Sequence, residues 1–266
     1  MSKSFKITVI FIVIGILISI AVNLNIGFMN LSFSDFFSSN SGHSQIAQLR
    51  INRVLVMMLA GISIPTSGFL LQVYFQNPLA GPSVLGITSV ASLSVAFYIF
   101  FSKDVILPEF LQNSFLSFSA IAGSLGLMFI LLAFSGRFQD KSFLIIFGFL
   151  ISALAGAVVS ILQFYAENQS LKNYILWSFG ANSQVSTNQV MVLSGFVLIG
   201  LLQSFKTLKP LFENSLGTAY AQSLGVTLKQ LKFFIIIASS LLSASVTDFL
   251  GPILFIGIVV PPFHRL

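Results

Sequence analysis

The sequence predicts an all-α protein built as a bundle of transmembrane helices, and three observations lead to that prediction. Only 8% of the 266 residues are charged, against about 25% in a soluble domain. The mean hydropathy is +0.97. The apolar residues form long continuous runs rather than the short alternating segments of a β-barrel. So few charges could not cover a water-facing surface, so we predict an integral membrane protein.

Eight segments of the chain are candidate membrane spans, since a helix crosses the hydrocarbon core with about 20 apolar residues. Segment 7–29 follows Lys3 and Lys6 as a signal peptide would. Its apolar run is too long for one and no clear cleavage site follows, so we interpret it as a retained span. The other candidates are 54–74, 84–102, 114–135, 142–164, 188–205, 232–248 and a shorter run, 253–263. Pro65 should kink its span, and Pro210 should break the segment that enters the next loop.

The basic residues predict the orientation of the chain. With a cytoplasmic N-terminus and alternating spans, the inner segments carry Lys3, Lys6, Arg137, Lys141, Lys206, Lys209, Lys229, Lys232 and Arg265. The outer segments carry Arg50, Arg53, Lys103 and Lys172. This inward excess is typical of membrane proteins. The net charge of +6 is spread thinly, so we expect a lipid bilayer as partner and no nucleic acid. Trp177, the single tryptophan, is interpreted as an interfacial anchor.

Several kinds of chemistry have no motif in this chain. There is no cysteine, and His43 and His264 lie far apart, so we expect no metal site. The stretch GRFQDKS at 136–142 lacks the second glycine of a phosphate-binding loop, and no hydrolase motif occurs. No charged residue lies at mid-span, which disfavours a proton-driven carrier. We therefore expect no catalytic residues and no bound cofactor, but a conduit powered by a separate protein.

Residues 50–89 carry a long motif, RINRVLVMMLAGISIPTSGFLLQVYFQNPLAGPSVLGITS. It resembles the second-span pattern of the FecCD family, roughly RxPRxL…GxxLxxSGxxxQxxxxNPLAxPxxLGxxxGA. LWSFGANSQVSTNQV at 176–190, LGTAYAQSLGV at 216–226 and GPILFIGIVVPPFHRL at 251–266 resemble later family segments. The chain departs from the pattern at Asn52, where the family usually has proline. It also stops where the family continues for about two more spans.

The resemblance implies the permease fold of a type II ABC importer, here as one permease domain over residues 1–266 with about 8 of the usual 10 spans. Such a subunit moves an iron–siderophore, haem or cobalamin across the cell inner membrane. It is not itself an enzyme. A second permease copy, identical or not, two ATP-binding subunits and an extracytoplasmic substrate-binding protein are its expected partners. ATP and Mg²⁺ would bind to the ATPase partner.

The resemblance also implies roles for particular residues. Arg50 and Arg53 would dock the binding protein, although an interfacial anchor or a lipid phosphate contact would use arginine equally well. Asn77, Pro78 and Leu79 would form a cytoplasmic gate, or a rigid turn that only packs. Within the connection 206–232, the ATPase coupling segment would include Leu216, Gly217, Ala221, Leu224 and Gly225, with a short helix over 218–224; an ordinary interfacial loop is the alternative. Gly148, Ser152 and Gly156 would line the pathway, or simply allow close helix packing.

Two other functions remain open from the sequence. One is a permease of the related metal-ion ABC class, which the motif at 50–89 disfavours. The other is an inactive, shortened membrane remnant, which the early end of the chain keeps open. The sequence does not identify the ligand, because specificity in such importers lies largely in the binding protein.

Overall fold

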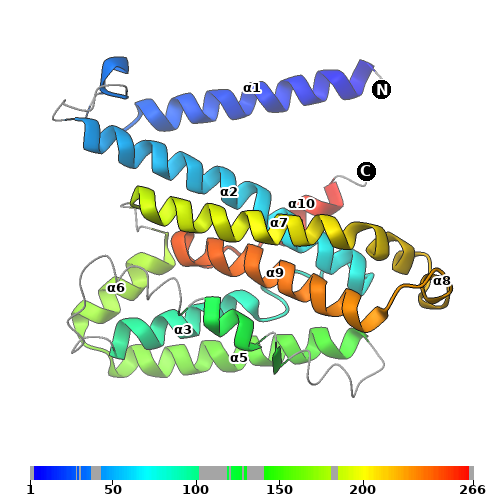
Figure 1. The fold of residues 1–266 in the computed structure, drawn as a ribbon. Coiled ribbons are helices and arrows are strands. Elements are labelled where there is room, and N and C mark those ends of the chain that lie inside the picture. Colours follow the sequence, from blue (N-terminus) through cyan, green and yellow to red (C-terminus); the bar gives the residue numbers. More distant parts are fainter. Residues whose placement is uncertain are drawn as a thin grey trace. The chain divides into compact units, whose positions relative to one another are not determined.

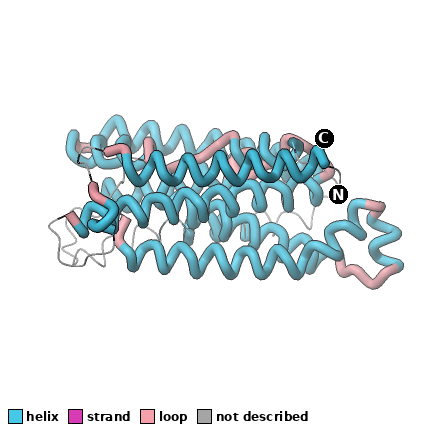
Figure 2. Tube along the Cα trace, turned by 90° about the horizontal axis from the view of Figure 1, so that it is seen from above, coloured by secondary structure: helices cyan, strands magenta, loops and turns pink. Residues whose placement is uncertain are grey.

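The structure is a computed structural model that describes residues 3–27, 29, 31–36, 43–101, 119, 121–127, 129–130, 141–180 and 185–263. Every regular element in these residues is helical (Figure 2). The chain forms two compact units, one of Met1–Met58 with Ser183–Val190 and one of Leu59–Asn182 with Met191–Leu266. The all-α prediction is confirmed.

The smaller unit contains α1 (Lys3–Asn25), the short 3-10 helix η1 (Phe33–Phe36), the first part of α2 (Ser44–Phe75) and the first residues of α7 (Thr187–Ser215). Helix α1 is apolar on all sides, and no residue of its membrane-length segment Ile7–Asn25 is buried within the chain. Asn52 is buried and its Nδ2 donates to the Val185 carbonyl at 2.8 Å. Proline, which the family usually has at this position, has no side-chain donor. Asparagine at position 52 therefore adds a hydrogen bond that proline could not make.

The larger unit contains the rest of α2 and α7 together with α3 (Ile87–Phe101), α5 (Lys141–Tyr165), α6 (Asn168–Ser178), α8 (Thr218–Ser223), α9 (Leu228–Leu250) and α10 (Ile256–Phe263). Helix α3 packs against α5, α6 and α9. Helix α9 lies in the interior of this unit, and 72% of its most apolar window is buried. Figure 1 shows α7 and α9 running side by side, with α8 at the end where the chain turns back.

Small residues let α2 approach its neighbours in the larger unit closely. Ser67 Oγ donates to the Ser239 carbonyl at 2.9 Å, and Ser239 Oγ donates to the Ser67 carbonyl at 3.4 Å. At the next residue of α2, the backbones of Gly68 and Gly257 lie so close that a Cβ on Gly68 would overlap the Gly257 carbonyl. Contacts of this kind are the usual means of helix association in a membrane, where lipid removes most of the hydrophobic drive between helices.

Five described helices are long and apolar enough to cross a membrane: Ile7–Asn25, Ser44–Phe75, Ser142–Tyr165, Thr187–Ser215 and Leu228–Leu250. They confirm five of the predicted spans: 7–29, 54–74, 142–164, 188–205 and 232–248. The predicted span 84–102 appears as the shorter apolar helix Ile87–Phe101. Span 253–263 contains only the eight residues of α10. Much of 114–135 lies outside the described residues, as do Lys103, Arg137, His264 and Arg265.

Two local predictions are wrong. Helix α7 does not break at Pro210 but continues to Ser215. A proline removes one backbone bond, whereas Leu211 is fully buried in the core and holds the next turn in place. Trp177 is not an interfacial anchor, because it is only 3% exposed and its Nε1 donates to the Asp248 carbonyl at 2.8 Å. It packs with Tyr174, and burial raises the pKa of the Tyr174 phenol above its ordinary value.

Candidate functional site

The turn between α2 and α3, residues 76–86, is the centre of the candidate site. Helix α2 ends with the Asn77 amide donating to the Gln72 carbonyl at 3.2 Å and the Gln76 amide donating to the Val73 carbonyl at 3.4 Å. This pair of bonds is a Schellman motif, which needs a left-handed residue where glycine is usual. Gln76 takes that place with φ 52°, and it is the one non-glycine residue with positive φ in the described chain.

Asn77 shapes the next part of the turn. Its Oδ1 accepts a hydrogen bond from the Leu79 amide at 2.9 Å, the bond of an Asx turn. Pro78 and Leu79 project outward, and the Leu79 side chain is 66% exposed although it is apolar. Below them, the core cluster of the larger unit closes around Ala80, Leu85 and Ile87. The turn therefore has a rigid buried base and an apolar exposed tip.

The turn rests directly on α5. A Cβ added to Gly148 would lie 2.8 Å from both Cα and O of Leu85, so only glycine lets the two backbones come this close. Ser152 Oγ donates to the Gly148 carbonyl at 3.0 Å and to the Ser83 carbonyl at 3.4 Å. Gly156 differs, because it is exposed and an added Cβ would meet nothing within 4 Å. Within this chain, two of the three predicted pathway residues brace the turn and the third faces outward.

The turn is also joined to the end of α7, directly before the predicted coupling segment. Gln76 Nε2 donates to the Ser215 carbonyl at 3.3 Å. One turn earlier on α2, Gln72 Nε2 donates to the Ile258 carbonyl of α10 at 2.9 Å. Ser83 Oγ donates to the Leu254 carbonyl at 3.2 Å. These bonds connect the turn both to the helix that leads to α8 and to the segment that contains α10.

The predicted short helix over 218–224 is confirmed as α8, and it has a defined end. The Val226 amide donates to the Ala221 carbonyl and the Gly225 amide to the Gln222 carbonyl, both at 3.0 Å. Gly225, with φ 87°, occupies the left-handed position of this second Schellman motif. Leu216, Tyr220 and Leu224 are exposed apolar side chains here, whereas Ala221 is fully buried. The outward face of α8 therefore includes Tyr220, which the sequence motif did not single out.

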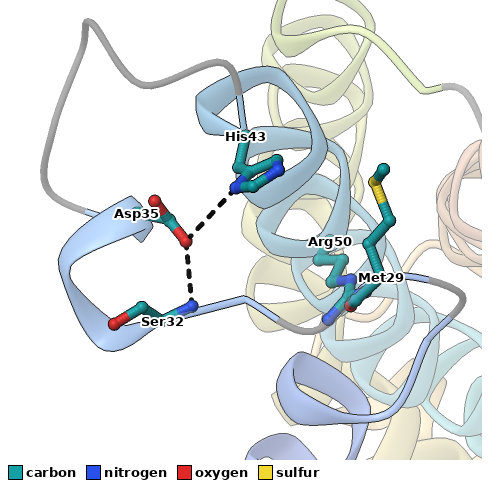
Figure 3. A network of polar contacts seen from close by, with 5 residues as sticks. All are labelled: Met29, Ser32, Asp35, His43 and Arg50. Atoms are coloured by element: carbon teal, nitrogen blue, oxygen red, sulfur yellow. Dashed lines mark hydrogen bonds and ion pairs between the residues drawn. The ribbon is translucent and has the colours of Figure 1, made fainter.

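The two predicted docking arginines have different surroundings in the smaller unit. Arg50 Nη1 donates to the Leu24 carbonyl at 2.8 Å and the Asn25 carbonyl at 3.4 Å, and Nη2 donates to the Met29 carbonyl at 2.6 Å. The guanidinium thus caps the C-terminal end of α1, where a helix favours positive charge. Figure 3 shows Arg50 reaching Met29. Arg53 is exposed and has no hydrogen bond or ion pair with a described residue.

A pocket of about 550 Å³ lies beside these arginines in the same unit. It is lined by η1, the start of α2 and the start of α7, including Asp35, Gln48, Asn52 and Thr187. The Asp35 carboxylate accepts from the Ser32 amide at 2.8 Å and lies 3.8 Å from His43 Nδ1 (Figure 3). Among the described residues, no three His, Cys, Asp or Glu side chains gather as metal ligands would.

Five helices of membrane length among the described residues define a multi-span membrane protein. The sequence profile of the FecCD transport family matches residues 12–266. The chain belongs to the FecCD transport family.

Relatives and a solved structure share most of the chain. The hemin transport system permease HmuU of Yersinia pestis is 31% identical over 264 residues, covering 96% of this chain and 77% of the relative. The vitamin B12 import system permease BtuC of Photorhabdus laumondii subsp. laumondii is 31% identical over 231 residues, covering 86% and 67%. An ABC transporter structure in an inward-facing conformation, provisionally of metal-chelate type, has a TM-score of 0.77 at 25% identity and covers 94% and 77%.

Proposed function

We propose that this chain is the permease subunit of an ABC importer that moves an iron chelate, haem or cobalamin across the cell inner membrane. Relatives named for hemin and vitamin B12 support this substrate class, because all of these ligands are bulky and chelate a metal. The two compact units act together as one permease domain over residues 1–266, since α2 and α7 contribute residues to both. The N-terminus is cytoplasmic, as the distribution of basic residues indicates.

One observation carries the mechanism: the turn at 76–86 is bonded to the helix that enters the coupling segment. A second permease copy completes the pathway, and two ATP-binding subunits with ATP and Mg²⁺ engage α8 from the cytoplasm. Movement of α8 reaches Ser215 first, and the bond from Gln76 to the Ser215 carbonyl passes it to the turn. Asn77, Pro78 and Leu79 then act as the cytoplasmic gate, with Leu79 presenting an apolar tip that excludes ions and water.

The pathway side of the gate follows from the contacts of α5. Gly148 and Ser152 fix the distance between α5 and the turn. The turn can therefore shift only by sliding along α5 or by moving together with α5. Gly156, exposed beyond the turn, presents a small neutral surface to the pathway. A wall without charge suits a large ligand that must pass without being retained.

Docking of the extracytoplasmic binding protein falls chiefly to Arg53. An arginine fork binds a carboxylate in a bidentate manner, and the Arg53 fork is exposed. Arg50 donates three hydrogen bonds to carbonyls at and just beyond the end of α1, so its part in docking is to hold α1 and α2 in position beneath the contact. A pull-down with the binding protein tests this: Arg53→Glu should abolish association, and unchanged affinity would contradict the assignment.

Reconstitution tests the proposal as a whole. The chain is placed in vesicles with its ATPase and binding protein, and uptake of a ferric siderophore, haem and cobalamin is measured with and without ATP. ATP-dependent uptake of one of them is expected. No uptake of any of the three, with an assembled complex that hydrolyses ATP, would favour a metal-ion permease or a scaffold. Asn77→Ala should change leakage or uptake without loss of folding.

A further inference from the structure

A second pocket, of about 490 Å³, lies in the larger unit between the last turns of α7 and the first turns of α9. Residues three or four apart share a helix face, and two such faces meet here. Helix α7 contributes Lys206, Lys209 and Glu213, α9 contributes Phe234, and the residues after α8, from Leu224 to Val226, also line the pocket. The volume is that of a ligand pocket, roughly 300–1,000 Å³.

The pocket has both charged and apolar lining residues. Lys206 and Lys209 are exposed and form no ion pair with Glu213 or another described residue. Phe234 and Leu224 are apolar lining residues, 40% and 52% exposed. On α7, exposed Phe205 directly precedes Lys206, and exposed Leu202 lies one turn before it. The lysines therefore stand where the apolar surface of a membrane-length helix gives way to polar residues.

We propose that this pocket binds an anionic glycerophospholipid. Lys206 and Lys209 hold its phosphate, Glu213 accepts a hydrogen bond from a headgroup hydroxyl, and the acyl chains lie along Phe205, Leu202 and Phe234. Basic pockets between transmembrane helices on the cytoplasmic side are established sites for such headgroups. A phosphatidylglycerol headgroup suits both the lysines and Glu213, because its phosphate is an anion and its hydroxyls are neutral hydrogen-bond donors.

The position of the pocket gives the lipid a consequence for coupling. Leu224, Gly225 and Val226 form both the wall of the pocket and the Schellman end of α8. A bound headgroup fills the space between this end and α7. The lipid therefore steadies α8 in the orientation that the structure shows. This inference does not depend on which substrate the transporter carries.

Lipid binding to the purified full chain tests the proposal by native mass spectrometry. Phosphatidylglycerol should bind more tightly than phosphatidylcholine or phosphatidylethanolamine. Each lysine near the surface is worth about fivefold in affinity for anionic lipid. The double variant Lys206→Gln, Lys209→Gln should therefore bind phosphatidylglycerol about 30-fold more weakly. The double arginine variant should retain binding, which separates loss of charge from loss of folding.

Lys229→Gln is the matched control, because Lys229 is exposed on α9 but does not line the pocket. It should leave phosphatidylglycerol affinity within about twofold of the parent. Equal losses in the control and the double variant would overturn the proposal, as would equal binding of phosphatidylcholine. Inorganic phosphate that binds as strongly as the lipid would show a free-anion site instead. A double variant that keeps lipid affinity but loses the ATPase would assign the lysines to that partner.

Discussion

Single glycines decide how closely the turn at 76–86 approaches α5. We predict that Gly148→Ala destabilises the protein by about 1–3 kcal/mol, because its Cβ would meet the Leu85 backbone. Gly156→Ala on the same helix has open space at its Cβ and should be neutral or stabilising by up to about 1 kcal/mol. Thermal unfolding in detergent measures both. Equal melting temperatures for the two variants would contradict the close packing.

The two arginines provide a second test on single residues. Arg50→Gln removes the charge that caps α1, and we predict a loss of about 1.5–3 kcal/mol in unfolding free energy. Arg53→Gln removes no described contact and should change stability by less than about 0.5 kcal/mol. Thermal melts of the two variants, run side by side, give the comparison. A larger loss of unfolding free energy for Arg53→Gln than for Arg50→Gln would show that the Arg53 side chain is not exposed in the folded protein.

Helix α8 is the element whose exposed face is most open to test. The chain has no cysteine, so one introduced thiol is unique. Tyr220→Cys, labelled with a maleimide that carries a photoreactive group, should crosslink to the ATPase on illumination, because Tyr220 is 51% exposed. Ala221→Cys should not, because Ala221 is fully buried beneath the helix. Crosslinking from position 221 alone would mean that α8 presents its other side to the ATPase.

The end of α8 depends on Gly225. Its φ of 87° is a conformation that costs an alanine about 1–2 kcal/mol. We predict that Gly225→Ala lowers substrate-stimulated ATP hydrolysis several-fold while the permease still assembles, because the strain is confined to α8. Gly195→Ala, which has open space around its Cβ, is the control. If substrate stimulated ATP hydrolysis in Gly225→Ala as strongly as in the parent, the geometry of the end of α8 would have no part in coupling.

Across the larger unit, contacts connect the residues of three predicted sites. The residues predicted as the gate follow α2, those predicted for the pathway lie on α5, and the predicted coupling segment follows α7. Gln76, Gly148 and Ser152 connect these parts through contacts with Ser215, Leu85 and Ser83. A change imposed at α8 has a continuous path of bonded and packed groups to the turn. This arrangement is the physical basis on which the permease function is proposed.

Composition and local patterns were enough to predict the membrane class, the long helices and the short helix α8. Long apolar runs leave a chain in lipid few alternatives, because every backbone polar group must be bonded within a helix. The positions of turns were also readable, since the Asn-Pro-Leu sequence and Gly225 have strong conformational preferences. These properties depend on residues close together in the chain.

Long-range packing decided what the local pattern could not. Trp177 was expected at the interface, yet it is buried with Tyr174 and bonded to the Asp248 carbonyl. Pro210 was expected to end its helix, yet the buried Leu211 carries α7 onward. The local pattern around Arg50 also did not show that its guanidinium caps carbonyls lying 21 to 26 positions earlier in the chain. Composition and the length of the apolar runs are enough to show that this protein crosses a membrane as helices. Which polar groups are used inside, and which remain available to partners, follows from the folded structure, because burial and bonding depend on contacts between distant residues.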